Sequence, residues 1–220
     1  MKAAAPVHRR WEALSVSAED FLPEKYEYPS LKKAAAGCRG CPLFKRATQT
    51  VFGEGSLRAK VFLVGEQPGD QEDKAGRPFV GPAGRIMEKA LLEAGLERSE
   101  IYVTNVVKHF KWRPQGDKRI HEKPDSAEIA ACKPWLKAEL ELIQPEILVC
   151  LGVTAAEAVL DRKVTIKRER GRFFRTDFSA ATYVTVHPSS LLRQPDSESR
   201  RKAYREFLAD MKKVRRRLEM

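Results

Sequence analysis

The sequence predicts an α/β fold with three layers, in which helices cover both faces of a central, mainly parallel four-stranded sheet. Four short apolar runs are typical of buried strands: residues 60–64 (KVFLV), 101–103 (IYV), 147–151 (ILVCL) and 183–186 (YVTV). Segments with helical apolar periodicity lie between them. Strands that alternate with helices favour a parallel sheet covered on both faces. With 220 residues, the chain is long enough to bury the core of one such domain.

The other elements can be assigned in chain order. Residues 1–30 are mixed in character and contain prolines, so we expect an N-terminal arm, with residues 31–220 forming a single domain. Residues 82–95 predict a helix, because their apolar positions fall on one face and Gly95 stands at the end. Residues 112–124 carry a glycine, flanking prolines and many charges, and this composition predicts a loop.

The second half of the chain begins with a strong helix start. Asp125 is a predicted N-cap, and Glu128 three residues later completes a capping box. After the third strand we expect a short helix, a charged irregular segment and a C-terminal helix, at residues 154–160, 161–181 and 197–218. The irregular segment is expected to turn back as a hairpin around Gly171.

The chain is strongly basic, with a net charge of +11 and a pI of about 9.6. This charge favours a polyanionic partner such as nucleic acid. A basic C-terminal tail is the simpler alternative, but the chain would stay basic without it. No run of about 18 apolar residues exists to span a membrane, and no apolar signal core follows residues 1–11. We therefore expect a cytoplasmic protein whose cysteines are reduced or bound to metal.

Four cysteines suggest a metal site. Cys38 and Cys41 form a CxxC pair, whereas Cys132 falls in a predicted helix and Cys150 in a predicted strand. Four sulfur ligands suit either zinc or an iron–sulfur cluster. The alternative for the distant pair is that both are small core residues, because free cysteine buries well. The wide spacing of that second pair favours a cluster over a zinc ribbon.

Polar motifs follow the predicted strands directly. GEQPG follows the first strand, Thr-Asn the second and HPSS the fourth. The carboxyl ends of parallel strands share one edge of the sheet, where ligands bind in α/β folds. Glu66 and His187 are therefore candidates for one pocket, with Asn105 beside them. Taken singly, each has a simpler reading, as a solvated acid, a His-Pro turn and an asparagine in a turn.

Together these motifs resemble the uracil-DNA glycosylase superfamily, and within it the iron–sulfur branch called family 4. The resemblance runs from about Cys38 to Leu208, and it rests on the four cysteines and on residues 65–69 (GEQPG), 77–81 (RPFVG), 104–105 (TN) and 187–189 (HPS). Gln67 and the inserted loop at residues 116–124 resemble the UdgX subgroup, whose members bind uracil-DNA irreversibly through a histidine in a KRRIH-type loop. This chain has DKRIH, so one arginine of that loop is not matched.

The resemblance implies how a uracil base is bound. Such enzymes flip the base out of the helix or act on single strands. Phe79 would stack on the base, although a lone phenylalanine is more often a core residue. The amide of Asn105 would donate to uracil O4 and accept from N3–H, which cytosine cannot satisfy. His187 would donate to O2 as negative charge builds on the departing base.

Two residues of the first polar motif, and a third just after it, receive roles by the same resemblance. Gln67 would contact the base through its backbone or side chain. Glu66 would hold a histidine or polarise a water, as carboxylates do in glycosidases. Glu72 would lie near uracil C5 and exclude the methyl group of thymine.

His121 carries the most specific implication, which is covalent capture. Departure of uracil leaves an oxocarbenium-like sugar that water normally attacks at C1′, and a neutral imidazole nearby would attack first. The resulting bond has a poor leaving group and should persist. Lys118, Arg119, Ser189 and Ser190 would hold the strand phosphates. The alternative is a solvated histidine in a charged loop, and His109 is interpreted as structural or close to the DNA.

The resemblance therefore implies a monomeric uracil-DNA glycosylase that acts on single-stranded DNA, or on both forms, and then links itself to the abasic sugar through His121. It implies a structural [4Fe–4S] cluster on the four cysteines, with no redox chemistry. Two alternatives stay open: an ordinary multi-turnover family 4 enzyme, and a non-catalytic metal-bearing module that binds nucleic acid.

Overall fold

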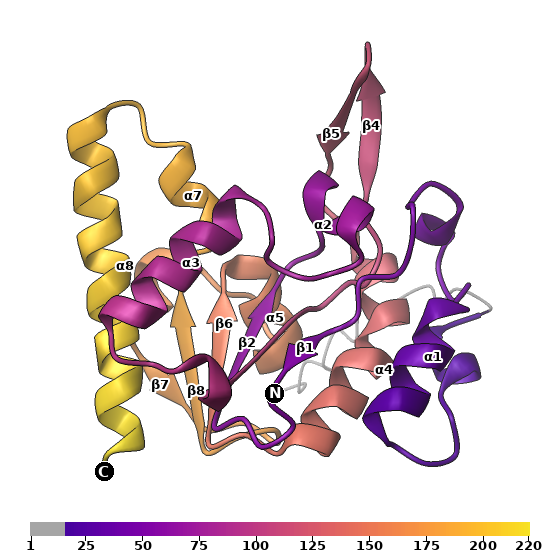
Figure 1. Cartoon of the computed structure of the whole chain (residues 1–220), viewed down its shortest axis with the longest axis horizontal. Coiled ribbons are helices and arrows are strands. Elements are labelled where there is room, and N and C mark those ends of the chain that lie inside the picture. The colour runs from indigo at the N-terminus through magenta and orange to yellow at the C-terminus, as the bar shows by residue number, and fades with distance from the viewer. Residues whose placement is uncertain (1–15) are drawn as a thin grey trace, which may run out of the picture.

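A six-stranded mixed sheet forms the middle layer of the fold. The computed structural model describes residues 16–220, and the strands in them follow the order β1-β3-β2-β6-β8-β7. The four inner strands are the predicted ones and run parallel: β3 (Ile101–Asn105), β2 (Val61–Gly65), β6 (Ile147–Leu151) and β8 (Ala181–Thr185). Their carboxyl ends share one edge of the sheet, which is the upper edge in Figure 1.

The predicted count of four strands is wrong, because a short strand extends the sheet at each edge. β1 (Glu54–Gly55) pairs antiparallel with β3, and β7 (Phe173–Phe174) pairs antiparallel with β8. Strands of two residues leave no alternating pattern in a sequence. The segment before β8 also holds a short helix, α6 (Ile166–Glu169), and the chain turns between β7 and β8 rather than at Gly171.

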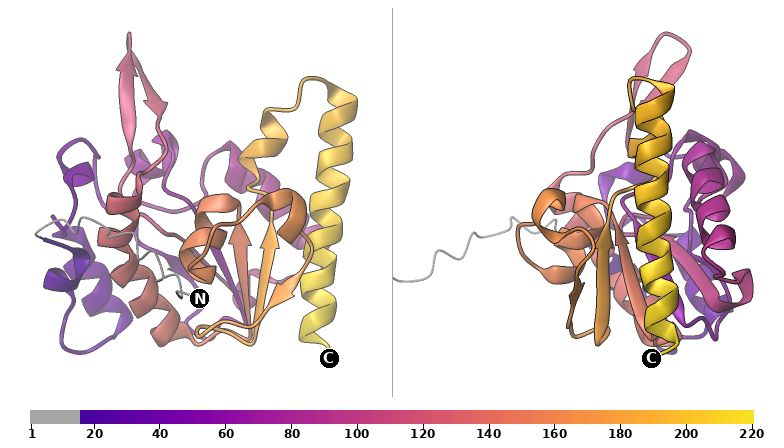
Figure 2. Two further views of the ribbon diagram at one scale, coloured as in Figure 1. Left: turned by 180° about the vertical axis from the view of Figure 1, so that it is seen from behind. Right: turned by 90° about the vertical axis from the view of Figure 1, so that its left-hand side faces the viewer.

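Helices cover both faces of the sheet, as the sequence predicts. Side chains alternate along a strand, so Val61 and Leu63 pack into one core while Phe62 and Val64 pack into the other. The first core lies under α3 (Pro82–Glu93) and α8 (Ser197–Leu218), and the second lies under α1 (Tyr28–Ala36), α4 (Ser126–Ile143) and α5 (Val153–Leu160). The side view in Figure 2 shows the sheet between helical layers.

The long helices lie close to their predicted bounds, and α8 begins and ends at the predicted residues. In the capping box of α4, Asp125 accepts a hydrogen bond from the backbone N–H of Glu128 at 2.9 Å. The carboxylate of Glu128 accepts one in return from the N–H of Asp125 at 2.8 Å. A helix that the sequence does not predict, α2 (Asp70–Ala75), follows β2, because six residues are too few to display helical periodicity. Single-turn helices complete the elements: η1 (Ala18–Phe21), η2 (Pro42–Lys45), η3 (Arg98–Glu100) and α7 (Ser189–Leu192).

A β-hairpin stands where the sequence predicts a loop, and this prediction is wrong. β4 (Trp112–Gln115) pairs antiparallel with β5 (Lys118–His121) as a separate two-stranded sheet. The hairpin projects beyond the upper edge of the main sheet in Figure 1. Its residues are mostly polar and exposed, so no apolar alternation marks the strands in the sequence.

The start of the described chain packs against the domain. Of the arm expected over residues 1–30, residues 1–15 lie outside the described residues. From Ala18, which is buried, η1 lies against α4. Across residues 16–220, no helix combines the length and the apolar character that crossing a membrane requires.

Candidate active site

A cavity of about 940 Å³ opens at the carboxyl edge of the parallel strands. Its lining includes Glu66 after β2, Asn105 at the end of β3 and His187 after β8. Phe79 and His121 also line it, from the segment before α3 and from the hairpin. The predicted meeting of polar motifs at one sheet edge is therefore confirmed for Glu66 and His187, which are far apart in the sequence.

Three side chains converge over Gly65 to form the floor of this cavity. A Cβ atom at this glycine would lie 2.4 Å from Oδ1 of Asn105 and 2.9 Å from Cζ of Phe79. It would also lie 3.4 Å from Nε2 of His187. Only glycine therefore leaves the amide, the aromatic ring and the imidazole free to meet one flat ligand, and we call this group of residues the pocket floor.

The position of Phe79 depends on an unusual backbone conformation. Its φ is +56°, in the left-handed region that a phenylalanine rarely adopts. Gly84, in the first turns of α3, permits it, because a Cβ there would fall 1.7 Å from the carbonyl oxygen of Phe79. The Phe79 ring lies 6.1 Å from the ring of His187, centroid to centroid, at an interplanar angle of 31°.

Glu72 holds the two loops that flank this part of the pocket. One carboxylate oxygen accepts a hydrogen bond from the N–H of Gly81 at 2.8 Å, and the other accepts one from the N–H of Gly69 at 3.1 Å. Both oxygens are therefore occupied by backbone N–H groups at the starts of α3 and α2. Glu72, for which the resemblance predicts a position near uracil C5, lines the cavity, but the contacts of its carboxylate are with the protein.

His187 is held as a neutral hydrogen-bond donor. The N–H of Ser189 donates to Nδ1 at 3.2 Å, so in the neutral ring the proton lies on Nε2, which faces the pocket floor. Burial is the main cause that lowers the pKa of His187 to about 4, and the neighbouring Arg193 and His121 lower it further. The hydroxyl of Ser189 lies 2.8 Å from Nδ1, and that of Ser190 donates to the carbonyl of His187 at 2.7 Å. Both serines, predicted to contact phosphate, thus support the histidine.

Glu66 and His121 meet at the mouth of the cavity. Nε2 of His121 lies 3.4 Å from Oε1 of Glu66, and Oε2 of Glu66 accepts a hydrogen bond from the hydroxyl of Thr154. The His121 side chain is 50% exposed and lies at the end of β5, with its ring centroid 6.2 Å from that of Phe110. The imidazole is therefore both accessible and held beside a carboxylate.

Gln67 and Arg119 attach the hairpin to the domain. The amide nitrogen of Gln67 donates to the carbonyls of Lys111 and Glu122 at 3.2 and 2.9 Å, and its oxygen accepts from the N–H of Lys111 at 3.0 Å. Arg119 binds Asp70 at 2.5 Å and the fully buried Asp73 at 2.7 Å. Gln67, predicted to contact the base, and Arg119, predicted to contact phosphate, thus make extensive contacts inside the protein.

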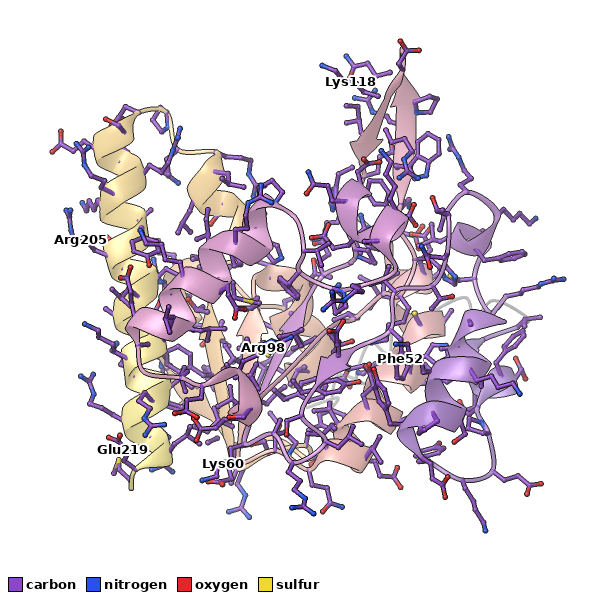
Figure 3. The ribbon with its side chains drawn as sticks, in the orientation of Figure 1. Phe52, Lys60, Arg98, Lys118, Arg205 and Glu219 are labelled. Atoms are coloured by element: carbon purple, nitrogen blue, oxygen red, sulfur yellow. The ribbon has the colours of Figure 1, made fainter. Side chains whose placement is uncertain are left out.

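Lys118 differs from its neighbour Arg119. It is exposed near the tip of the hairpin, as Figure 3 shows. Within residues 16–220 it has no acidic partner within salt-bridge distance, so it is available to a phosphate. Sequence reasoning treats the two residues alike, because neighbouring basic residues look equivalent until the acids across the fold are known.

Three of the four cysteines lie close together. Cys38 accepts hydrogen bonds from the indole N–H of Trp135 at 3.3 Å and from the N–H of Gly40 at 3.5 Å. Cys132 accepts one from the N–H of Lys108 at 3.2 Å. Burial is the main cause that raises the pKa of Cys41 to about 11, and the neighbouring Cys38 raises it further. Burial is also the main cause that raises the pKa of Cys132 to about 12, with added contributions from Cys41 and Cys38.

Cys150 is separate from this group, and His109 is a competing fourth ligand. Burial raises the pKa of Cys150, whereas neighbouring cysteines also raise the pKa of Cys41 and that of Cys132. Nε2 of the buried His109 lies 2.9 Å from the hydroxyl of Thr50, while Nδ1 is buried without a hydrogen-bond partner in the described residues. Burial also lowers the pKa of His109 to about 4, which keeps the ring in its metal-binding neutral form.

The donors at this site fit a cluster better than a single ion. In the part of the chain that is described, no three His, Cys, Asp or Glu side chains lie close enough to hold one metal ion. A four-iron cluster is larger than one ion and spaces its ligands more widely. Buried sulfurs together with an unpaired imidazole nitrogen are suitable donors for such a group.

A buried ion pair beside the pocket is missed by sequence reasoning. Nζ of Lys108 lies 2.5 Å from Oε2 of Glu139 on α4, and both side chains are 0% exposed. The sequence signal is weak: a lysine that closely follows a buried strand, and a glutamate within an apolar stretch of helix. Such residues are normally assigned to the surface.

Comparison with known proteins identifies the family. Residues 52–212 match the model of the uracil DNA glycosylase superfamily. A type-4 uracil-DNA glycosylase of Thermotoga maritima is 41% identical over 165 residues, which is 74% of this chain and 82% of that protein. A type-4 uracil-DNA glycosylase of Sulfurisphaera tokodaii is 34% identical over 193 residues, 84% of this chain and 82% of that protein. This chain therefore belongs to the uracil DNA glycosylase superfamily.

Proposed function

We propose that this protein cleaves the bond between uracil and deoxyribose in DNA. The observation that carries the proposal is the convergence of Asn105, Phe79 and His187 over Gly65. The similarity to proteins named type-4 uracil-DNA glycosylases supports it. The net charge of +11 suits a nucleic-acid substrate. We further propose that the protein acts as a cytoplasmic monomer, on single-stranded DNA or on both forms.

The pocket floor supplies what uracil recognition needs. Phe79 would stack on the base, while the amide of Asn105 donates to O4 and accepts from N3–H. Cytosine reverses both groups and would leave buried polar atoms unpaired, so it would be rejected strongly. When the N1–C1′ bond breaks, its electron pair departs with the base, and the neutral Nε2–H of His187 would donate to O2 where negative charge grows.

We propose that His121 then captures the sugar. The supporting observation is its position at the mouth of the same cavity, with Nε2 3.4 Å from Oε1 of Glu66. A lone pair of the neutral imidazole would form a bond to C1′ of the oxocarbenium ion, and the ring N–H proton would pass to solvent, aided by the neighbouring carboxylate. The DKRIH sequence of the hairpin resembles the corresponding loop of the UdgX subgroup, and this resemblance also supports covalent capture.

An ordinary multi-turnover glycosylase is the second candidate. It is favoured by the similarity to type-4 enzymes and by Glu66, whose carboxylate could orient an attacking water instead. In that case His121 would contact the DNA without forming a bond.

A denaturing gel distinguishes these candidates. We expect equimolar protein and single-stranded uracil oligonucleotide to give a band resistant to heat and SDS, absent for His121→Ala. Free abasic DNA in excess over wild-type protein, without such a band, would establish turnover and refute capture. If neither product forms, the glycosylase proposal itself is refuted and a non-catalytic binding module is favoured.

We also propose a [4Fe–4S] cluster on Cys38, Cys41 and Cys132. When bound, it would tie the loop before η2 to α4, and neither bond cleavage nor capture needs electron transfer. Cys150 is the ligand predicted from the sequence, whereas the unpaired Nδ1 makes His109 the stronger candidate for the fourth. Iron content and visible absorbance should fall in His109→Ala and persist in Cys150→Ala, and the reverse pattern would assign Cys150.

A further inference from the structure

The buried amine of Lys108 is bound on three sides by oxygen atoms. Nζ lies 2.6 Å from the hydroxyl of Thr104, 2.6 Å from the carbonyl of Asn105 and 2.5 Å from Oε2 of Glu139. Lys108 and Glu139 are both fully buried. A buried ion pair is a weak source of stability, because desolvation of both charges offsets their attraction. Stability alone therefore does not explain why this pair is present.

One of the three oxygens belongs to the backbone of the residue proposed to read the base. The carboxamide of Asn105 points to the pocket floor, while its carbonyl is fixed by Lys108 from behind. The next two residues continue this constraint, since the N–H groups of Val106 and Val107 donate to Gly65 and Glu66 at 3.0 Å each. The backbone at Asn105 is therefore restrained from both sides.

Glu139 connects this arrangement to the helical layer. Besides Lys108, its carboxylate accepts hydrogen bonds from the hydroxyls of Tyr102 and Thr104 at 3.1 and 3.0 Å. It also accepts one from the N–H of Gly53 at 2.9 Å. A single side chain of α4 thus fixes the end of β3 relative to α4, which also carries Cys132.

Lys108 also contacts the cysteine site through its own backbone. Its N–H donates to Sγ of Cys132, while its side chain reaches back to Asn105. The two sites are therefore joined through one residue.

We propose that Lys108 and Glu139 are a positioning pair, which holds the backbone of Asn105 so that its carboxamide meets the uracil edge. This inference rests on the proposed glycosylase function. The pair touches neither base nor sugar, and it acts through Asn105. Its removal should slow uracil excision even where the fold is intact.

The test separates positioning from stability with an uncharged replacement of both partners. Lys108→Met alone leaves the buried carboxylate of Glu139 without its cation and should lower both the Tm and the excision rate. Lys108→Met with Glu139→Gln removes both charges, keeps an amide oxygen as acceptor for the donors of Gly53, Tyr102 and Thr104, and should recover much of the Tm. Because a displacement near 1 Å can cost about 10²-fold in rate, single-turnover excision by the double variant should stay well below wild type. Rates are compared in preparations matched for folded fraction and iron content.

Two further variants keep the proposal falsifiable if the double variant does not fold. Glu139→Gln keeps an oxygen for Lys108, so its excision rate should stay close to wild type even if its Tm falls. Arg170→Met removes a different ion pair, which is only partly buried and joins Asp210 on the opposite side of the sheet, and it should lower Tm without changing the excision rate.

The outcomes are decisive for the pair and for the function separately. A double variant that regains both Tm and rate would overturn the positioning role, as would a Glu139→Gln variant whose rate falls as far as that of Lys108→Met. A wild-type protein that releases no uracil would instead refute the function on which the inference rests.

Discussion

The pocket floor and the hairpin bring residues to one cavity by opposite means. The floor is made at the ends of central strands, where Asn105 is buried and its backbone is bound on both sides. The hairpin is an exposed projection that is attached through Gln67 and Arg119. Base recognition is therefore built into the core of the fold, whereas His121 is carried by an addition to it. Excision and capture should respond separately to mutation.

The largest effect is expected at the floor. Asn105→Ala removes the amide that would pair with uracil, and it should lower single-turnover excision by about 10²–10³-fold. Covalent adduct should fall in parallel, because capture follows bond cleavage. The rates of both are measured on denaturing gels, with and without alkali treatment. Adduct formation at the wild-type rate would separate capture from the floor and contradict this order of events.

A mutation at Arg119, which attaches the hairpin to the domain, is expected to have an intermediate effect, and on capture alone. Arg119→Met removes the ion pairs with Asp70 and Asp73, so His121 should lose its fixed position. Adduct yield should fall by about 10- to 100-fold, while excision stays within a factor of about three. Lys118→Met, one residue away and exposed, is the matched control. Equal loss of excision and capture would mean that the two regions are not independent.

A pH series examines His187 in the floor. Its pKa is lowered from 6.5 to about 4, so the ring should stay neutral and excision should be steady from pH 8 to pH 5. Between pH 6.5 and 4 this imidazole is protonated in the unfolded chain but neutral in the native chain. The contribution of His187 to the free energy of unfolding is therefore complete above pH 6.5 and is lost as pH falls toward 4. Urea midpoints of wild type and His187→Gln should therefore converge toward pH 4. A difference that widens on acidification would place the pKa above 6.5.

The smallest effect is expected at the tip of the hairpin. Lys118→Ala should leave Tm unchanged, because the side chain is exposed and has no acidic partner among residues 16–220. If Lys118 contacts one phosphate, the slope of log K against log salt for single-stranded DNA should decrease in magnitude by about 0.7. An unchanged slope in binding titrations would show that the tip does not reach the DNA.

The parts that the sequence predicts are those encoded locally. Each inner strand is an apolar run, and the capping box of α4 lies within four residues. The meeting of Glu66 with His187 follows from parallel topology, because consecutive parallel strands end at a common edge. Regular local patterns and one general rule of chain connection were enough for these features.

The parts that the sequence does not predict depend on partners far along the chain. The hairpin lacks apolar alternation, and β1 and β7 exist only because β3 and β8 accept them. The pairing of Arg119 with Asp73 spans 46 residues, and that of Lys108 with Glu139 spans 31. Nothing in either neighbourhood indicates the match. Spacing likewise groups four cysteines, whereas in the structure Cys38 and Cys41 both raise the pKa of Cys132, and Cys150 does not enter that group.

Gly84 has a consequence for how mutations in this protein would be tolerated. It does not line the cavity, and its importance lies only in the space it leaves for the carbonyl of Phe79. In a saturation library it should rank with pocket residues for intolerance, although an alanine there would favour the helix by about 1 kcal/mol on propensity alone. A position chosen for helix stabilisation could therefore disable the site without altering any residue that meets the ligand.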